Sequence, residues 1–336
     1  MEMKEYIREF TLTDVVSVRN PKVVALGGGT GLSVILRGLK KYTRRLTAVV
    51  TVGDDGGSSG MLREDLGILP PGDIRNCILA LADDENVMQA LFNYRFETGG
   101  LEGHNFGNLF LAAMSGISHD FYDAVRRTSD VLQIKGRVLP VTLDNMVLMA
   151  ELRNGLQVEG ESRIPEKSKE SGSPIKTIYL KSGKIRPLEE TLEAIKEADI
   201  IIIGPGSIYT SVIPNLLVEG IEQAIEDNRG KKFYIGNIMT QPGESTGMTH
   251  ADHIRALENH QQREDRKLFH YAVLNNGVLP KSVSETYQKY GSTKVEMGEL
   301  DDKYEYIMDD FILTQNGKVR HDADLLARRI FETYVG

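Results

Sequence analysis

The sequence predicts an α/β fold with a doubly wound, mainly parallel sheet. Apolar runs with the composition of strands alternate with segments whose apolar residues recur at helical spacing. One of these runs, Ile200 to Ile203, contains isoleucine only, which is typical of a central strand buried on both faces. Glycine-containing polar loops follow the runs, as in folds where helices connect parallel strands.

The first part of the sheet begins close to the N-terminus. An apolar strand at 23–26 leads into the glycine loop 27–31, and a strand at 46–52 leads into a second glycine loop at 53–60. A third polar loop, 70–76, opens a helix. In an open α/β sheet the loops that follow the strands gather at one edge, where ligands bind. We therefore expect the functional site at this edge.

The alternation of strands and helices resumes after residue 186. Further strands are predicted at 200–203, 232–238 and 269–274, and helices at 250–260 and from residue 322 onward. Between them, residues 137–186 contain short runs that alternate or are rich in β-branched residues. We expect a small β-rich insertion at about 137–186 within a single domain of residues 21–336, preceded by an N-terminal extension over residues 1–20.

Two local signals describe the interior of the insertion. Arg153-Asn154-Gly155 contains the Asn-Gly pair that is typical of a tight hairpin. The stretch from Glu161 to Pro174 is charged and contains serines and prolines, so we predict a solvated loop there.

Composition limits the classes of protein to consider. The chain has 336 residues, a net charge of −8 and a pI near 5.5, which argues against a nucleic-acid surface. Its one cysteine, Cys77, excludes an intrachain disulfide and suits a reducing compartment. No apolar run approaches the roughly 20 residues of a membrane-spanning helix. We expect a soluble cytoplasmic protein with no nucleic-acid partner and no membrane span.

The first glycine loop matches neither common nucleotide fingerprint. No Lys-Ser/Thr pair follows the glycines, as a Walker A loop requires, and Leu32 occupies the third glycine position of G-x-G-x-x-G. Consecutive glycines still allow a close approach of backbone to ligand, and the following helix presents free N–H groups to an anion. Ligand contact is favoured over a purely structural turn for four residues: Gly28, Gly29, Thr30 and Gly31.

Asp54 and Asp55 follow the second strand. An acidic residue there can hold ribose hydroxyls, or it can hold Mg²⁺ against a phosphate. A turn or a helix cap is the structural alternative. Because adjacent side chains of an extended segment point in opposite directions, we expect only one of the two carboxylates to reach a ligand.

Other polar residues near the loops are weaker candidates. Asp73 is predicted to cap the helix that begins at Ile74. Arg75 and Asn76, in its first turn, and His104 and Asn105, before another helix, could face a ligand or the solvent. The seven histidines show no H-E-x-x-H spacing, so a dedicated zinc site is not expected.

The loop after the all-isoleucine strand is the second strong signal. It spans Gly204 to Ser211 and offers glycines, hydroxyl groups and the start of a helix. These groups suit a phosphate or a sugar hydroxyl. A structural turn around Pro205 is the alternative. The candidate ligand contacts here are Gly206, Ser207, Tyr209 and Thr210.

Five segments together resemble a known family. They read GGGTGLSVILRGLK, VTVGDDGGSSGMLR, PPGDIRNCILAL, GPGSIYTSVIPNLLV and NIMTQPGESTG. These segments are similar to those of the bacterial gluconeogenesis factor family (YvcK type), within the 2-phospho-L-lactate transferase-like (CofD-like) superfamily. The resemblance runs in order from about Pro21 to the C-terminal helix.

The resemblance implies a Rossmann-like three-layer α/β/α fold and a cytoplasmic protein required for cell shape on gluconeogenic carbon sources. It also implies binding of a UDP-sugar such as UDP-N-acetylglucosamine, with contacts from Tyr290 and Arg320. The related transferase has Asn-Thr where this chain has Thr51-Val52, and a different segment where this chain has residues 70–76. Both changes put the transferase reaction in doubt.

Three hypotheses follow. The first is a nucleotide-sugar-binding regulatory protein of cell morphogenesis. The alternative is a Mg²⁺-dependent transferase acting on a nucleotide-activated donor, with Asp54 or Asp55 at the catalytic centre. A third, an oxidoreductase with an NAD-like dinucleotide, is disfavoured by Leu32. The sequence leaves open whether the chain forms homo-oligomers, binds regulatory proteins or catalyses any reaction.

Overall fold

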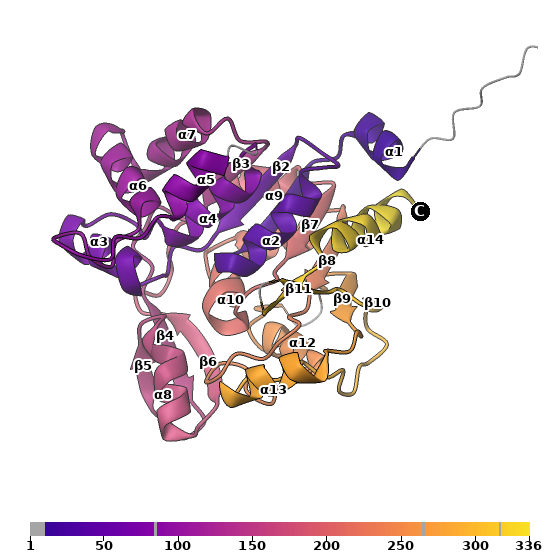
Figure 1. Ribbon diagram of the computed structural model, residues 1–336. Coiled ribbons are helices and arrows are strands. Elements are labelled where there is room, and N and C mark those ends of the chain that lie inside the picture. The colour runs from indigo at the N-terminus through magenta and orange to yellow at the C-terminus, as the bar shows by residue number, and fades with distance from the viewer. Residues whose placement is uncertain (1–10, 84–85, 264–265, 316) are drawn as a thin grey trace, which may run out of the picture.

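A seven-stranded, all-parallel sheet forms the centre of the molecule (Figure 1). The computed structural model describes residues 11–83, 86–263, 266–315 and 317–336. The strands, in their order across the sheet, are β10 (Glu305–Asp309), β9 (Tyr271–Asn275), β8 (Lys231–Ile235), β7 (Ile200–Ile203), β1 (Val23–Gly27), β2 (Leu46–Val50) and β3 (Arg137–Pro140).

The strand order reverses between β1 and β7. From β1 the chain proceeds outward through β2 and β3, then returns to place β7 on the other side of β1 and proceeds outward again. This is the Rossmann arrangement with one further strand at its end, and its switch point lies between β1 and β7. The predicted doubly wound, mainly parallel α/β fold is confirmed.

Successive residues of the central strands pack into different halves of the core. Val24 and Leu26 of β1 belong to one apolar cluster, whereas Val23 and Ala25 belong to the other. The isoleucines of β7 divide between the clusters in the same way. This alternation follows from the two-residue period of a strand, so a sheet covered on both faces needs apolar residues at every position.

Helices cover both faces of the sheet and complete the three layers (Figure 1). The helices that supply one apolar cluster are α1 (Leu12–Arg19), α2 (Gly29–Leu39), α4 (Gly72–Leu81), α5 (Asn86–Asn93), α6 (Phe106–Ile117), α7 (Phe121–Val131) and α14 (Ala323–Val335). Those that supply the other are α8 (Arg163–Ser171), α9 (Glu189–Lys196), the π-helix η1 (Ile208–Val212), α10 (Ile213–Leu216), α11 (Ile221–Asp227) and α12 (His250–Glu258). The remaining helices are α3 (Gly57–Leu66) and α13 (Lys281–Lys289).

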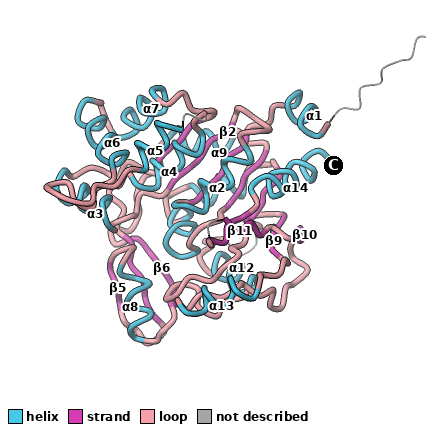
Figure 2. Tube along the Cα trace, in the orientation of Figure 1, coloured by secondary structure: helices cyan, strands magenta, loops and turns pink. Residues whose placement is uncertain are grey.

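A small antiparallel sheet projects from the main body, as the tube trace shows (Figure 2). Its strands, in spatial order, are β5 (Gln157–Glu159), β4 (Leu148–Leu152) and β6 (Ile175–Leu180). The hairpin predicted at Asn154-Gly155 joins β4 to β5, with Gly155 at φ +86°. Within the range 137–186, β3 belongs instead to the central sheet.

The solvated loop predicted for residues 161–174 is wrong, because α8 occupies most of this stretch. Ile164 and Ser168 lie four residues apart and are both buried, so one face of the helix packs on the small sheet. Gly172 ends the helix in the left-handed conformation. Of the extension expected over residues 1–20, α1 lies in the second half, and residues 1–10 lie outside the described residues.

Within the described ranges, no helix combines the length and apolar character that crossing a bilayer requires.

We predict that Gly38→Ala lowers the free energy of unfolding by about 1–3 kcal/mol. Gly38 lies where α2 packs on α14, and a Cβ atom there would collide with the backbone carbonyl of Ala323. Chemical denaturation of the purified chain measures the effect. Gly116→Ala is the matched control, because Gly116 is also helical but has open space around its Cβ position. It should be neutral or stabilise by up to about 1 kcal/mol, and equal effects of the two changes would contradict the packing argument.

Candidate functional site

A cavity of about 400 Å³ lies at the switch point of the sheet. The first loop after β1 contributes Gly28 to Gly31, and the loop after β7 contributes Pro205 to Ser207. Because both loops follow the carboxyl ends of adjacent parallel strands, they face the same crevice. This is the edge where the sequence predicts the site.

Glycine is required in the first loop because other groups approach its backbone closely. A Cβ atom on Gly31 would lie 2.8 Å from the carbonyl oxygen of Pro205, and one on Gly28 would lie 2.6 Å from a carboxylate oxygen of Asp73. Gly29 has φ +63°, a conformation that suits glycine. The two switch-point loops are therefore in backbone contact, with no room for side chains between them.

The loop after β7 is held by side chains from the loop after β8. Asn237 forms a reciprocal amide pair with Gly206, in which the Gly206 N–H donates over 3.2 Å and the Asn237 side chain donates to the Gly206 carbonyl over 2.7 Å. The Gln241 amide donates to the Ser207 hydroxyl over 2.6 Å. These contacts fix the loop on both sides of its glycine.

Glu244 anchors the start of η1. Its carboxylate accepts hydrogen bonds from the backbone N–H groups of Tyr209, at 2.8 Å, and Thr210, at 3.2 Å. Burial raises the pKa of Glu244 to about 7, although these hydrogen bonds act in the opposite direction. The carboxylate is therefore used to position the backbone at the cavity wall.

Three carboxyl groups line the cavity, from three different parts of the chain: Asp54, Asp73 and Glu161. Burial, followed by the charge of Asp54, raises the pKa of Asp73 to about 7. The same two causes, in the same order, raise the pKa of Glu161 to about 8. Near neutral pH a large fraction of these two groups is protonated, so they can donate hydrogen bonds.

The prediction that Asp73 caps its helix is wrong. The helix begins at Gly72, and its N-cap position is Pro71, with no side-chain cap. The Asp73 carboxyl turns toward the first glycine loop, where it accepts from the backbone N–H of Gly29. The close packing of the loop against α4 leaves this side chain in the cavity wall.

Arg320 is the one arginine or lysine among the described residues that line this cavity. It lies on β12 (Lys318–His321), which pairs with β11 (Ile312–Gln315) in a separate hairpin, and donates to the carbonyl of Val319 over 3.0 Å. Its neighbour His321 also lines the cavity, and burial lowers the pKa of His321 to about 4. The histidine is therefore neutral and donates to the Gly236 carbonyl, over 3.1 Å.

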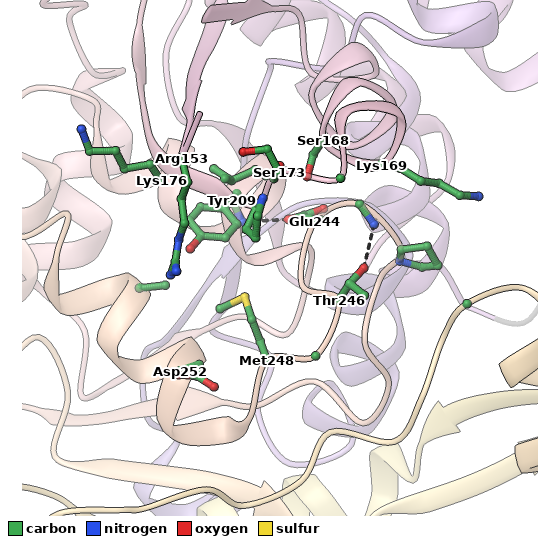
Figure 3. A pocket seen from close by; sticks show the side chains of 18 of the residues that line it. Arg153, Ser168, Lys169, Ser173, Lys176, Tyr209, Glu244, Thr246, Met248 and Asp252 are labelled. Carbon is green, nitrogen blue, oxygen red and sulfur yellow. Dashed lines mark hydrogen bonds between the residues drawn. The ribbon is translucent and has the colours of Figure 1, made fainter. Parts of the chain in front are cut away.

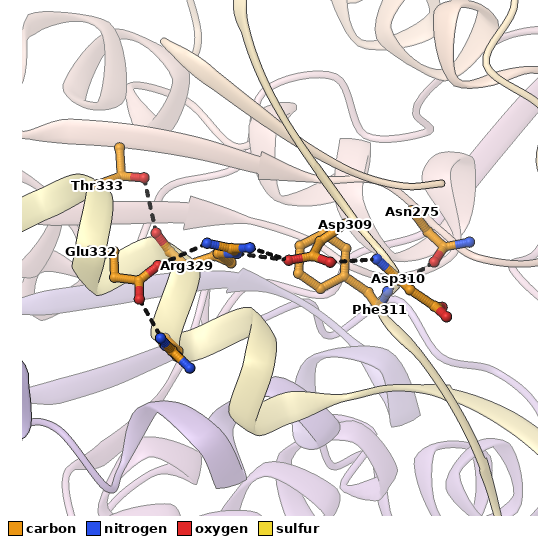
Figure 4. Close-up of polar contacts among 8 residues, drawn as sticks. Asn275, Asp309, Asp310, Phe311, Arg329, Glu332 and Thr333 are labelled. Carbon is orange, nitrogen blue, oxygen red and sulfur yellow. Dashed lines mark hydrogen bonds and ion pairs between the residues drawn. The ribbon is translucent and has the colours of Figure 1, made fainter. Parts of the chain in front are cut away.

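Contacts at both ends fix this hairpin in place (Figure 4). The Phe311 N–H, before β11, donates to the Asn275 side chain at the end of β9, over 3.0 Å. Arg329 of α14 pairs with Asp309 at the end of β10, at 2.6 Å. Because β9, β10 and α14 belong to the main body, the hairpin places Arg320 over the switch point.

Nine of the predicted site residues lie together around this cavity. They are Gly28, Gly29, Thr30, Gly31, Asp54, Gly206, Ser207, Thr210 and Arg320. Asp54 lines the cavity and Asp55 does not. The Asp55 carboxylate instead accepts from the Ser162 N–H over 2.8 Å. Adjacent side chains thus point to different sides, as expected for an extended segment.

The other predicted residues lie outside this cavity. Arg75 donates to the side chains of Asn76 and Asn108, at 2.7 and 3.1 Å. His104 lies 3.3 Å from the Ser58 hydroxyl, and Asn105 caps α6. Tyr209 lines a different cavity, and Tyr290 is 75% exposed at the end of α13. Ligand contact stays a prediction for these residues and for Asp55, and equally for the nine that line the cavity.

Sequence reasoning missed several lining residues, among them Thr51, Glu161, Asn237, Gln241 and His321. Asn237 and Gln241 follow β8, so the rule that indicated the other loops applies to them as well. Glu161 comes from the insertion, and no local pattern indicates that it reaches the switch point.

The described residues contain no group of three or more His, Cys, Asp or Glu side chains arranged to hold a metal ion. Mg²⁺ commonly needs only one or two carboxylates together with phosphate oxygens. Asp54 is the residue of this cavity that suits that arrangement, and a role in Mg²⁺ binding stays a prediction.

We predict that the wild-type protein loses unfolding free energy as pH rises from about 4.5 to 8, and that Glu161→Gln makes this loss smaller. An acid whose pKa is raised by folding binds its proton more tightly in the native state, so wild-type stability falls as pH rises through this window. The unfolding free energy of the variant, measured relative to that of the wild type, should rise by about 1–2 kcal/mol between pH 5 and pH 8. Partial exposure of Glu161 keeps this change below the full value that the pKa shift would give. Urea unfolding across pH measures this. Glu166→Gln, at an exposed position of α8, is the control, and identical pH profiles for wild type and Glu161→Gln would contradict the assignment.

Comparison with known proteins gives a consistent family assignment. The family described as 2-phospho-L-lactate transferase CofD matches residues 23–312. A relative from Clostridium acetobutylicum is 53% identical over 94% of this chain and 70% of its own length. The gluconeogenesis factor of Bacillus subtilis is 45% identical over 92% of this chain and 96% of its own length.

A solved structure agrees with both the fold and the family. The crystal structure of a UPF0052 family protein from Bacillus halodurans superposes with a TM-score of 0.86 and 43% sequence identity. The match covers 92% of this chain and 98% of that one. The chain therefore belongs to the gluconeogenesis factor family, within the wider family of the 2-phospho-L-lactate transferase CofD.

Proposed function

We propose that this protein is a cytoplasmic gluconeogenesis factor that binds a nucleotide-sugar of the UDP-N-acetylglucosamine type at the switch point. In this proposal, binding reports the level of an envelope precursor and supports cell shape during growth on gluconeogenic carbon sources. The observation that carries the proposal is that two glycine loops and one arginine surround a single cavity.

The diphosphate of such a ligand fits the first glycine loop and Arg320. Gly28 to Gly31 expose their backbone at the start of α2, an 11-residue helix whose N-terminus favours an anion. The Arg320 guanidinium supplies a full positive charge and a forked donor geometry, which suits phosphate oxygens. Both groups line the same cavity, as binding of one diphosphate by both would require.

The rest of the cavity suits a sugar and a base. Hydroxyl groups come from the lining residues Thr30, Ser207, Thr210 and Ser211. Val34, Ile238 and Met239 give an apolar surface for a flat ring. The mixture of a few directed polar groups with apolar surface is typical of sites for small ligands.

The carboxyl groups of the cavity are compatible with an anionic ligand because of their raised pKa values. Asp73 and Glu161, with pKa values of about 7 and 8, can be neutral donors near pH 7. A protonated carboxyl group can donate to a phosphate or sugar oxygen, whereas a carboxylate would repel the phosphate.

We predict that Arg320→Gln weakens the binding of UDP-N-acetylglucosamine by about 10- to 100-fold, the range expected for loss of a charge-assisted hydrogen bond. Isothermal titration calorimetry of the full chain with UDP-N-acetylglucosamine, GDP and NAD, side by side, measures affinity and selectivity. Lys318→Gln, a cation on the same strand that does not line the cavity, is the control. If wild type gives no heat with any UDP-sugar, the proposal fails.

A Mg²⁺-dependent transferase acting on a nucleotide-activated donor is the second candidate, and the position of Asp54 favours it. Asp54 follows β2 and lines the cavity beside the first glycine loop. A carboxylate there could hold Mg²⁺ against a donor phosphate and stabilise the charge of the leaving group.

If the chain is a transferase, we predict that Asp54→Asn lowers nucleotide release from the donor by at least about 100-fold, because Mg²⁺ loses its ligand. Chromatography of reactions with candidate donors and Mg²⁺ measures release. Asp65→Asn, at an exposed position of α3, should leave it unchanged. Release that persists in Asp54→Asn would remove the catalytic assignment, and ligand binding without release from any donor would favour a binding protein.

A further inference from the structure

A second cavity, of about 580 Å³, lies between the insertion and the segment that leads into α12 (Figure 3). The insertion contributes the β4–β5 turn and the connection between α8 and β6. The opposite wall is formed by residues 242–244 and 246–248 and by one face of α12. The volume is in the range of small-molecule sites.

The second cavity is rich in positive charge, although the chain as a whole carries a net charge of −8. Its basic residues are Arg153, Lys169, Lys176 and Arg255. Lys176 pairs with Glu151 at 2.7 Å and Arg255 with Asp252 at 2.7 Å, so among the described residues Arg153 and Lys169 are the two basic residues of the cavity without an ion pair. Its carboxylates are Glu244 and Asp252, and both already have partners within the protein.

The two carboxylates of the cavity are already engaged by groups of the protein itself. Glu244 accepts from the backbone of η1. Asp252 accepts from the Thr249 N–H, at 2.9 Å, in the capping box of α12 and pairs with Arg255 at 2.7 Å. Neither carboxylate is directed at Arg153. Within the described ranges, no carboxylate lies within ion-pair distance of its guanidinium.

Arg153 and Tyr209 form the polar centre of the cavity. Figure 3 shows the Arg153 side chain extending beside the Tyr209 ring, while the ammonium groups of Lys169 and Lys176 turn outward at the rim. Tyr209 is 7% exposed, and none of the described residues accepts from its hydroxyl. Burial raises the pKa of Tyr209, so the hydroxyl keeps its proton and is available as a donor.

Apolar groups surround this centre. Ile175 and Pro174 come from the insertion, and Met248, Pro242 and Ala256 come from the opposite wall. A ligand must therefore combine an anionic group with an apolar body to use both parts of the surface. Arginine offers a fork of donors that fits either phosphate or carboxylate oxygens.

From this arrangement we propose a second ligand site, which binds a small organic anion whose phosphate or carboxylate is carried on an apolar or aromatic body. Arg153 and the Tyr209 hydroxyl contact the anionic group, and the apolar wall contacts the body. The site is separate from the switch-point cavity, although η1 contributes to both. Thr210 faces the first cavity and Tyr209 the second.

Titration of the full chain with phenyl phosphate and with benzoate, followed by ligand-observed NMR, tests this site. Both probes carry an anion on an aromatic ring, and the tighter of the two identifies the preferred anionic group. Phenol lacks the charge and inorganic phosphate lacks the apolar body, so each should bind at least about tenfold more weakly than the tighter of the two aromatic anions. Saturable binding of at least one aromatic anion is the expected result.

Variants locate the binding. Arg153→Gln should weaken the aromatic anion by at least about tenfold, and Tyr209→Phe, which removes only the hydroxyl, by about three- to tenfold. Arg186→Gln, a cation at an exposed position near the end of the insertion, is the matched control and should change affinity less than about twofold. Arg320→Gln should also leave the affinity for the aromatic anion unchanged, because Arg320 lines the switch-point cavity. The second site is therefore tested independently of the proposed function.

Three results would overturn the second site. One is the absence of saturable binding of either aromatic anion to the wild-type chain. Another is an equal loss in Arg153→Gln and Arg186→Gln, which would indicate general charge attraction. The last is a loss in Arg320→Gln with affinity retained in Arg153→Gln, which would assign the probe to the switch-point cavity.

Discussion

The backbone contact between the loops after β1 and β7 is the constraint on which the site depends. Parallel pairing of these strands brings their carboxyl ends together, and Gly31 lets the first loop meet the Pro205 carbonyl without an intervening side chain. The same closeness turns Asp73 toward Gly28 and explains why that carboxyl group is half-buried and loses part of its hydration. The position of the cavity and the ionisation of its wall thus share one geometric cause.

The charge that the switch-point cavity presents to a ligand depends more on the burial of its carboxyl groups than on their number. Three carboxyl groups and one guanidinium line the cavity, a balance that would repel a phosphate if every acid were ionised. Burial shifts Asp73 and Glu161 toward their neutral forms, because a charged group loses its hydration there. A guanidinium group cannot be deprotonated in a protein, so the electrostatic potential at the cavity depends on which of the lining carboxyl groups are ionised.

Much of the fold could be predicted from the sequence, because a strand that is buried on both faces of the sheet has apolar residues at every position. The run Ile200 to Ile203 indicates a central strand, and the glycine loops indicate the edge where the cavity lies. The helix at 163–171 was not predicted, since only Ile164 and Ser168 of its residues are buried and the rest resembles a solvated loop. Local patterns carry little information about a helix that packs on a small sheet through so narrow a face.

The parts of the candidate site formed by one continuous loop could be predicted from the sequence. The parts formed by side chains from distant segments could not. Gly28 to Gly31 and Gly206 are recognisable because their chemistry lies in consecutive residues. Glu161 and His321 reach the cavity only through the placement of the insertion and the β11–β12 hairpin. Asp73 was misassigned because its position before a helix resembles a cap, whereas the close loop determines its direction.

The division of the cavity between backbone and side chains has a consequence for sequence change. Part of its wall is glycine backbone, whose N–H groups are the same in every protein that keeps the loop conformation. Another part consists of side chains such as Arg320, Glu161 and Gln241, which come from three separate segments. Exchanges of these side chains can alter ligand preference without disturbing the strands of the sheet, whereas a single added methyl group at Gly31 would meet the Pro205 carbonyl. A fold of this kind can diversify its ligands while its architecture stays fixed.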